Sequence, residues 1–71
     1  MRTYVKANKV KTGQIIDPLE EGTWYRVIEN KSVKLPGQRP HREIHVRPEN
    51  IDGWKVFTFD SSNDVRIRKD S

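Results

Sequence analysis

Two histidines four residues apart, His41 and His45, form the first spacing in this sequence that could support chemistry. On a helix, residues at this spacing share a face, as the zinc-binding histidines of metalloproteases do. Here prolines flank the segment, and its apolar residues alternate with polar ones, which predicts a strand. Residues four apart on a strand lie about 13 Å from each other, too far to bind one metal ion. We therefore predict two exposed histidines and no metal site.

Carboxylate pairs give no stronger indication of catalysis. Glu20-Glu21 and the pair Asp60 and Asp64 fall in segments that are typical of polar turns. General acid–base catalysis needs a carboxyl group whose pKa is raised by burial or by a neighbouring like charge, and no apolar pocket is predicted beside these turns. The chain has no cysteine, no Ser-His-Asp arrangement and no glycine-rich phosphate loop. We expect a protein that is not an enzyme and uses no cofactor.

Basic residues provide the best candidate for a binding site. They cluster over residues 34–47, with Lys31 just upstream, and they recur on the last predicted strand. Arg26 and Lys55 are expected on adjacent strands. Arginine and lysine bind phosphates and release counterions from nucleic acid. The candidate nucleic-acid contacts are Lys34, Arg39, Arg42, Arg47, Lys55, Arg66 and Arg68, followed by Lys69.

Within this set, Arg39, Arg42 and Arg47 are the expected principal contacts, because they share one loop and strand. The alternative is that long basic side chains only cover a small core while their charged ends stay in water.

The aromatic residues have two interpretations. Tyr4, Trp24 and Trp54, if exposed, could stack on bases as aromatic side chains do in single-strand binding proteins. A chain of this size, however, needs its aromatic side chains to bury enough apolar area. We therefore favour the core for them over a binding surface.

Length and composition define the class of protein. The 71 residues predict a single domain, 1–71, with a thin core. The net charge of +4 favours anionic partners, although charges of this size also serve solubility alone. The start of the chain lacks the apolar region of a signal peptide, and no apolar run approaches the roughly 20 residues of a membrane helix. We expect a soluble cytoplasmic protein with no membrane contact.

Hydrophobic patterning predicts strands and no helix. A turn at Thr12-Gly13 separates the first two strands, and the loop 34–40 and the Asp-Gly of residues 48–53 separate later ones. Apolar residues alternate with polar ones, or form short β-rich runs, in each predicted strand. The strands are expected near residues 3–5, 15–16, 23–28, 41–47, 54–59 and 65–68.

These strands predict an all-β fold, a small antiparallel barrel of five to six strands, because closure protects the edges of so small a sheet. The expected core comprises Val5, Val10, Ile15, Tyr25, Val27, Ile44, Val46, Trp54, Val56, Phe57, Phe59, Val65 and Ile67.

The order of features resembles the small SH3-like and Hint-like barrels, which are common in bacteriophage and actinobacterial genomes. Those domains open with the element A-x-x-L-K-x-G-D-x-I, which the segment from Ala7 to Ile16 fits, with Gln14 where Asp is usual. The resemblance implies an SH3-like fold and little about function. Self-splicing Hint members use an N-terminal nucleophile, which this chain lacks. Residues 10–16 also fit the opening V-x-x-G-x-x-V of the KOW barrels of elongation factors and ribosomal proteins.

Charge and resemblance together favour a small phage or bacterial binding protein that contacts DNA, RNA or a nucleic-acid-processing machine through a basic face. Two alternatives remain open. One is a protein-interaction module that modulates a host enzyme by strand-edge pairing. The other is a homodimer, or a larger homo-oligomer, that has a structural role and no ligand.

Overall fold

A computed structural model of the protein describes residues 2–49 and 52–68, and these form one antiparallel β-sheet. The predicted all-β class is confirmed. One 3-10 turn accompanies the six strands. The elements are β1 (Thr3–Lys6), η1 (Ala7–Lys9), β2 (Ile15–Asp17), β3 (Tyr25–Val33), β4 (His41–Pro48), β5 (Lys55–Asp60) and β6 (Asp64–Ile67). No helix in the described part of the chain is long and apolar enough to cross a bilayer.

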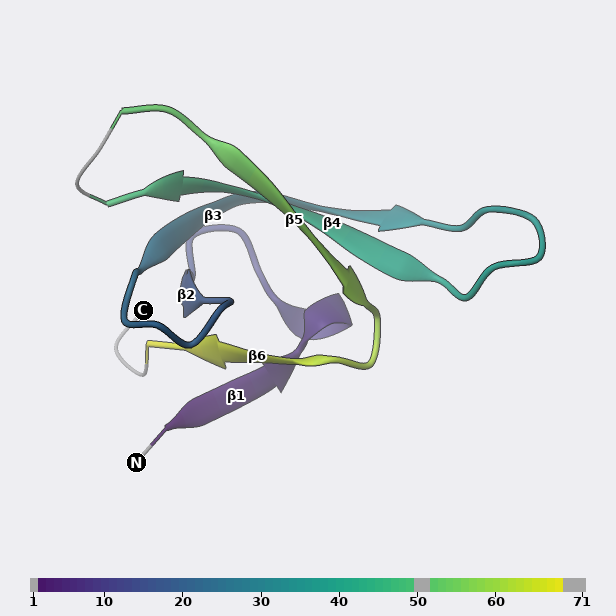
Figure 1. The fold of residues 1–71 in the computed structure, drawn as a ribbon, viewed down its shortest axis with the longest axis horizontal. Coiled ribbons are helices and arrows are strands. Elements are labelled where there is room, and N and C mark those ends of the chain that lie inside the picture. The colour runs from purple at the N-terminus through teal and green to yellow at the C-terminus, as the bar shows by residue number, and fades with distance from the viewer. Residues whose placement is uncertain (1, 50–51, 69–71) are drawn as a thin grey trace.

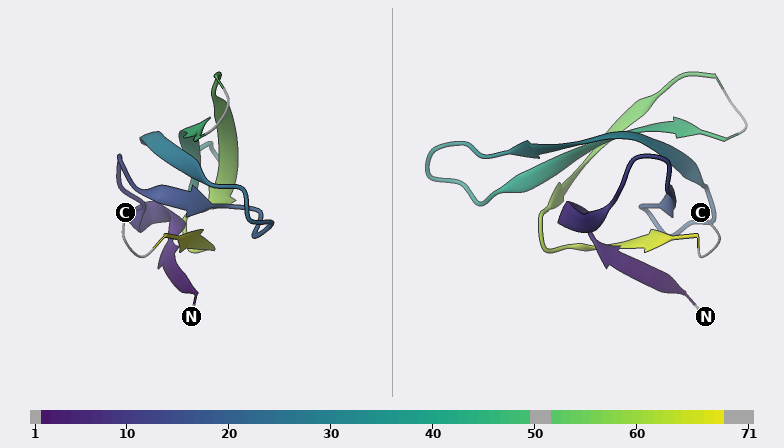
Figure 2. Two further views of the ribbon diagram at one scale, coloured as in Figure 1. Left: turned by 90° about the vertical axis from the view of Figure 1, so that its left-hand side faces the viewer. Right: turned by 180° about the vertical axis from the view of Figure 1, so that it is seen from behind.

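The sheet has the strand order β1-β6-β2-β3-β4-β5 and is strongly bent. Its β3–β4–β5 part lies over β1 and β6, and the short β2 joins the two parts (Figures 1 and 2). β1 and β5 are the two ends of the described sheet, and no pairing between them closes it into a barrel. The turn after β1 instead contacts the β5–β6 turn, since Ala7 N donates to Asn63 O at 2.7 Å.

A bulge in β3 changes the faces of this long strand. Val27 is opposite Val46, but Glu29 is opposite His45, so Ile28 is an extra residue in the pairing with β4. A bulge shifts the alternation of all later side chains. It turns Asn30 inward, where its Nδ2 donates to Ala7 O at 2.9 Å and to Val10 O at 2.8 Å. The bulge thereby fixes the η1 turn beneath the sheet.

The hairpin of β3 and β4 extends beyond the rest of the molecule, at the right of Figure 1. Its loop, residues 34–40, contains a tight turn. Gln38 N donates to Leu35 O at 3.1 Å, and Gly37 has a φ of 75°. Proline followed by glycine is the sequence preferred for such a type II turn, because the third position needs a positive φ.

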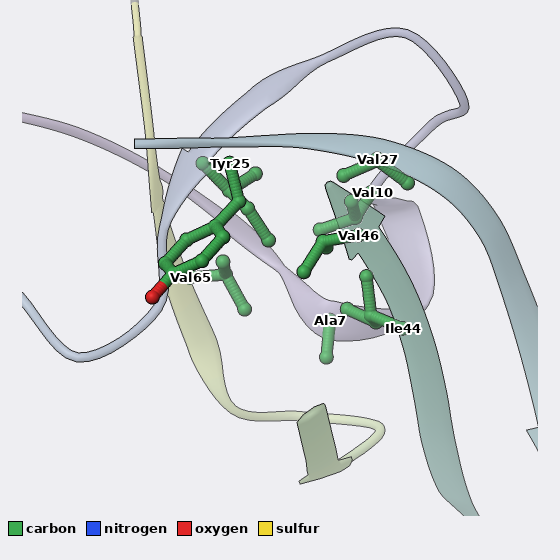
Figure 3. Packing of buried hydrophobic residues seen from close by; sticks show 8 residues of the cluster. Ala7, Val10, Tyr25, Val27, Ile44, Val46 and Val65 are labelled. Atoms are coloured by element: carbon green, nitrogen blue, oxygen red, sulfur yellow. The ribbon is translucent and has the colours of Figure 1, made fainter. Parts of the chain in front are cut away.

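The core lies between the two parts of the bent sheet (Figure 3). Partly buried side chains of Val5, Phe57, Phe59 and Ile67 pack against it. The buried hydrophobic cluster is Ala7, Val10, Ile16, Tyr25, Val27, Ile44, Val46 and Val65. Ile15 is also buried, as expected, but lies outside this cluster.

The assignment of two residues, Trp54 and Val56, to the core is wrong. They are 65% and 42% exposed. Side chains alternate along β5, so Phe57 and Phe59 face the core and the even-numbered positions face away from it. The core contains instead two residues that were not expected there, Ala7 and Ile16.

Candidate nucleic-acid interface

The outer face of β3, β4 and β5 is the side of the sheet turned away from the core. The register sets Arg26 on β3 directly opposite Arg47 on β4. Val46 is opposite Lys55 on the next strand, so the same register continued by one residue brings Trp54 beside Arg47. The groove that they line, of about 540 Å³, also has Glu29 in its lining. Its basic and aromatic part consists of Arg26, Arg47 and Trp54, together with His45 and Ile28. We call these five residues the basic–aromatic face.

The two arginines of this face are exposed. Residues directly opposite in an antiparallel pair have Cβ atoms about 5 Å apart, and like charges at that distance are destabilising. Within the described residues, neither Arg26 nor Arg47 forms an ion pair. The fold therefore brings two positive charges together without neutralising them.

Trp54 is the most exposed of the large hydrophobic side chains in the described chain. Its indole stacks on the ring of His45, with centroids 6.0 Å apart and planes 21° from parallel. Nε2 of His45 is buried and has no hydrogen-bond partner, and Oε1 of Glu43 is 4.0 Å from it. Ile28, the bulge residue, is 43% exposed beside this pair. The result is a flat aromatic surface next to two free cations.

The charge of the outer face changes along the hairpin. One row beyond Arg26 and Arg47, Glu29 is opposite His45, and in the following row Lys31 is opposite Glu43. Glu29 and Lys31 form an exposed ion pair at 3.9 Å. Positive charge without a partner is thus concentrated at the end of the face where Trp54 lies.

The structure does not bring Arg39, Arg42 and Arg47 to one surface. Arg39 and Lys34 lie in the exposed loop at the tip of the hairpin. Arg42 is five positions from Arg47 on the same strand, so it faces the opposite side. It lies between Ser32 and Phe59, and its Nε has no hydrogen-bond partner. The predicted principal contacts therefore occupy three different places.

Lys55 also lies on the inner side of β5, where its Nζ is 5.8 Å from the centre of the Tyr25 ring. This position is opposite Val46 and not beside Arg47. Lys55 covers an end of the core, as the alternative interpretation of the basic residues predicts.

The predicted basic stripe of β6 has partners within the fold. Arg66 NH1 is 2.9 Å from Oδ2 of Asp17, which is fully buried. The guanidinium of Arg66 also lies 4.8 Å from the centre of the Trp24 ring. Arg68 pairs with Glu49 at 3.1 Å. Lys69 lies outside the described residues. Arg66 and Arg68 are thus bound to acidic side chains, unlike Arg26 and Arg47.

A second hollow of about 460 Å³ lies at the base of the hairpin loop. Its lining has charges of both signs, from Arg39 and Asp60, and includes His41 and Thr58. These two charges cancel, whereas the groove of the basic–aromatic face has two arginines and one carboxylate, Glu29, and so attracts an anionic polymer more strongly. In the described ranges, no three His, Cys, Asp or Glu side chains are grouped as a metal ion would require.

Sequence reasoning missed His45 and Ile28 as parts of this face and placed Trp54 in the core. Arg26 was named as a neighbour and not as a contact. The signal that could have found the face is the pairing of β3 with β4, because only that register sets Arg26 beside Arg47. No protein-family model matches the chain, and no curated protein matches it.

Proposed function

We propose that the protein is a non-enzymatic binding protein that contacts nucleic acid through the basic–aromatic face. The observation that carries the proposal is the juxtaposition of Arg26 and Arg47 beside the exposed ring of Trp54, with no ion pair from either arginine to a described residue. Phosphates would neutralise the two guanidinium groups, and arginine presents a planar set of donors suited to phosphate oxygens. Release of counterions would supply much of the affinity.

Salt dependence tests this proposal. A fluorescently labelled oligonucleotide is titrated with the protein at several salt concentrations, beginning at low ionic strength. Each phosphate contact contributes about 0.7–0.9 to the slope of log K against log salt concentration. Replacing both arginines, Arg26→Ala with Arg47→Ala, should reduce the slope by about 1.4–1.8 and weaken binding to all sequences similarly.

The matched control is Lys34→Ala with Arg39→Ala at the hairpin tip, which removes the same net charge from a different surface. We expect the control to change the slope much less. Equal effects of the two double variants would mean that overall charge, and not this face, attracts the ligand. A protein that binds neither DNA nor RNA at low salt would refute the proposed function.

The fold-level resemblance belongs to the same proposal. We propose that the bent, open sheet is related to the SH3-like barrels and belongs to a cytoplasmic phage or bacterial protein. Its support is the opening element, in which Ala7 and Ile16 are buried and Gly13 has a φ of 92°. That φ favours glycine, as the turn in the resembled element would require.

The edge strand β5 supports a second candidate function. It pairs with β4 on one side, and it is an end of the described sheet. A free strand edge can add a strand from a protein partner or from a second copy of the chain. Light scattering over a range of protein concentrations tests the second copy, because a mass that stays monomeric at all concentrations would remove it.

A further inference from the structure

We propose that the target of the basic–aromatic face is an unpaired nucleic-acid strand, with one base stacked on Trp54 and its phosphate held between Arg26 and Arg47. This inference rests on the proposed function and adds the state of the ligand, single-stranded and not duplex. Three features of the face carry it: the open indole ring, the distance from that ring to the arginines, and the acidic side chains farther along the hairpin.

The open indole selects for unpaired bases. Trp54 is 65% exposed, and the contact with His45 supports the indole by stacking. Bases inside a duplex have both faces covered by neighbouring bases, so they cannot stack on a protein ring without being unstacked or flipped out. A single strand offers its base faces directly, and aromatic stacking is the usual way in which proteins hold it.

The arginines lie at the distance that one nucleotide can span. Neighbouring strands of a sheet are about 4.8 Å apart. Arg26 and Arg47 lie opposite each other on β3 and β4, and Trp54 immediately precedes β5, the next strand of the sheet. The two arginine side chains therefore start from neighbouring strands, and the indole starts one strand spacing farther. One phosphate can contact both arginines while its own base reaches the ring.

The acidic side chains of the outer face limit the length of nucleic acid that it can bind. Beyond the first row, the outer face carries three carboxylates, Glu29, Glu43 and Asp60, and one ammonium group, Lys31, which pairs with Glu29 at 3.9 Å. This part of the face has no excess of positive charge and therefore does not attract a polyanion. We expect the strand to be held at the row of Arg26 and Arg47, over a few nucleotides.

Fluorescence of Trp54 tests the inference directly. The variant Trp24→Phe leaves Trp54 as the single tryptophan, and it keeps an aromatic ring beneath Arg66. This protein is titrated with a short oligothymidylate, with a duplex of the same length, and with inorganic polyphosphate. We expect the oligothymidylate to quench Trp54 and to bind at least tenfold more tightly than the duplex. Polyphosphate should bind without such quenching.

Two substitutions separate stacking from charge in the otherwise wild-type protein. Trp54→Leu should weaken oligothymidylate binding about 5- to 150-fold, the range reported for loss of one stacked base, and should leave the salt slope unchanged. Trp54→Phe keeps an aromatic face and should restore most of the affinity. Because Trp54 is exposed, both variants should remain folded, which circular dichroism verifies.

The outcomes distinguish this inference from the proposed function. Equal affinity for duplex and single strand, without quenching of Trp54, would overturn the inference and leave nucleic-acid binding by the face intact. Polyphosphate binding as tight as that of the oligothymidylate would overturn it as well, because bases would then contribute nothing. Failure to bind any of the three ligands at low salt would overturn both.

Discussion

Asp17 is the buried charge that organises the turn after β2. Its Oδ1 accepts a hydrogen bond from Glu21 N at 3.1 Å, and its Oδ2 accepts bonds from Gly22 N and Arg66 NH1, both at 2.9 Å. Three donors compensate the carboxylate for the loss of water. Arg66 in turn lies over Trp24. The ion pair of the fully buried Asp17 thus supports the fold and lies away from the basic–aromatic face.

We predict that Asp17→Ala is strongly destabilising. Removing one partner of a buried pair leaves the other charge and two backbone N–H groups without acceptors, which costs about 3–5 kcal/mol. Urea denaturation measures the change in the free energy of unfolding. The control is Asp64→Ala, which breaks the exposed pair with Lys6 and should cost less than about 1 kcal/mol. Equal effects of the two changes would contradict the structural role of Asp17.

At the scale of strands, the unusual element is the pairing of β3 with β4. Most cross-strand pairs on its outer face combine opposite charges, as Lys31 and Glu43 do, or include a neutral residue. Arg26 and Arg47 are the exception, and their repulsion lowers stability. Under the proposed function, this cost in stability is a consequence of the two charges that would bind the ligand.

We predict that Arg47→Glu stabilises the fold and abolishes binding. The substitution places a carboxylate opposite Arg26, which converts repulsion to attraction across the pair, a gain of about 0.5–1 kcal/mol at low salt. Thermal unfolding at low and high salt measures this gain, which should shrink as salt screens the pair. A variant that is less stable than the wild type at low salt would show that the arginines do not repel each other.

The strands were predictable from the sequence where alternation is regular, and less so where it changes. β4 shows this best, because Ile44 and Val46 alternate with polar residues over its whole length. β3 was expected to end at residue 28 and continues to Val33. The bulge at Ile28 shifts the alternation there, and the polar residues after it have low strand propensity.

At the scale of the whole molecule, the sequence predicted an all-β fold with most of its core and missed the composition of the candidate site. Trp54, immediately before β5, and Val56 are exposed, whereas Phe57 and Phe59 pack against the core. Both sides of this segment carry apolar residues, so alternation alone could not assign the inner one. The meeting of Arg26 with Arg47 depends on the register of two strands joined by the loop 34–40. Register of this kind is set by tertiary packing and turn geometry.

The final prediction concerns the stability of the whole chain in the presence of ligand. A ligand that binds only the folded state stabilises it by about 2.7 kcal/mol at 100 times Kd. For a domain of this size, that corresponds to a rise in Tm of about 10–20 °C. We expect a single-stranded oligonucleotide to raise the Tm of the wild-type protein by this amount at low salt. Differential scanning calorimetry measures the shift.

The Arg47→Glu variant is the matched control for this measurement. Its Tm should be higher than that of the wild-type protein without oligonucleotide, because the repulsion with Arg26 is gone. With oligonucleotide the order should reverse, since the variant gains nothing from a ligand that it does not bind. This reversal in the order of the two Tm values distinguishes binding at the arginine pair from general electrostatic stabilisation. If both proteins gained equally, the ligand would be bound elsewhere on the molecule.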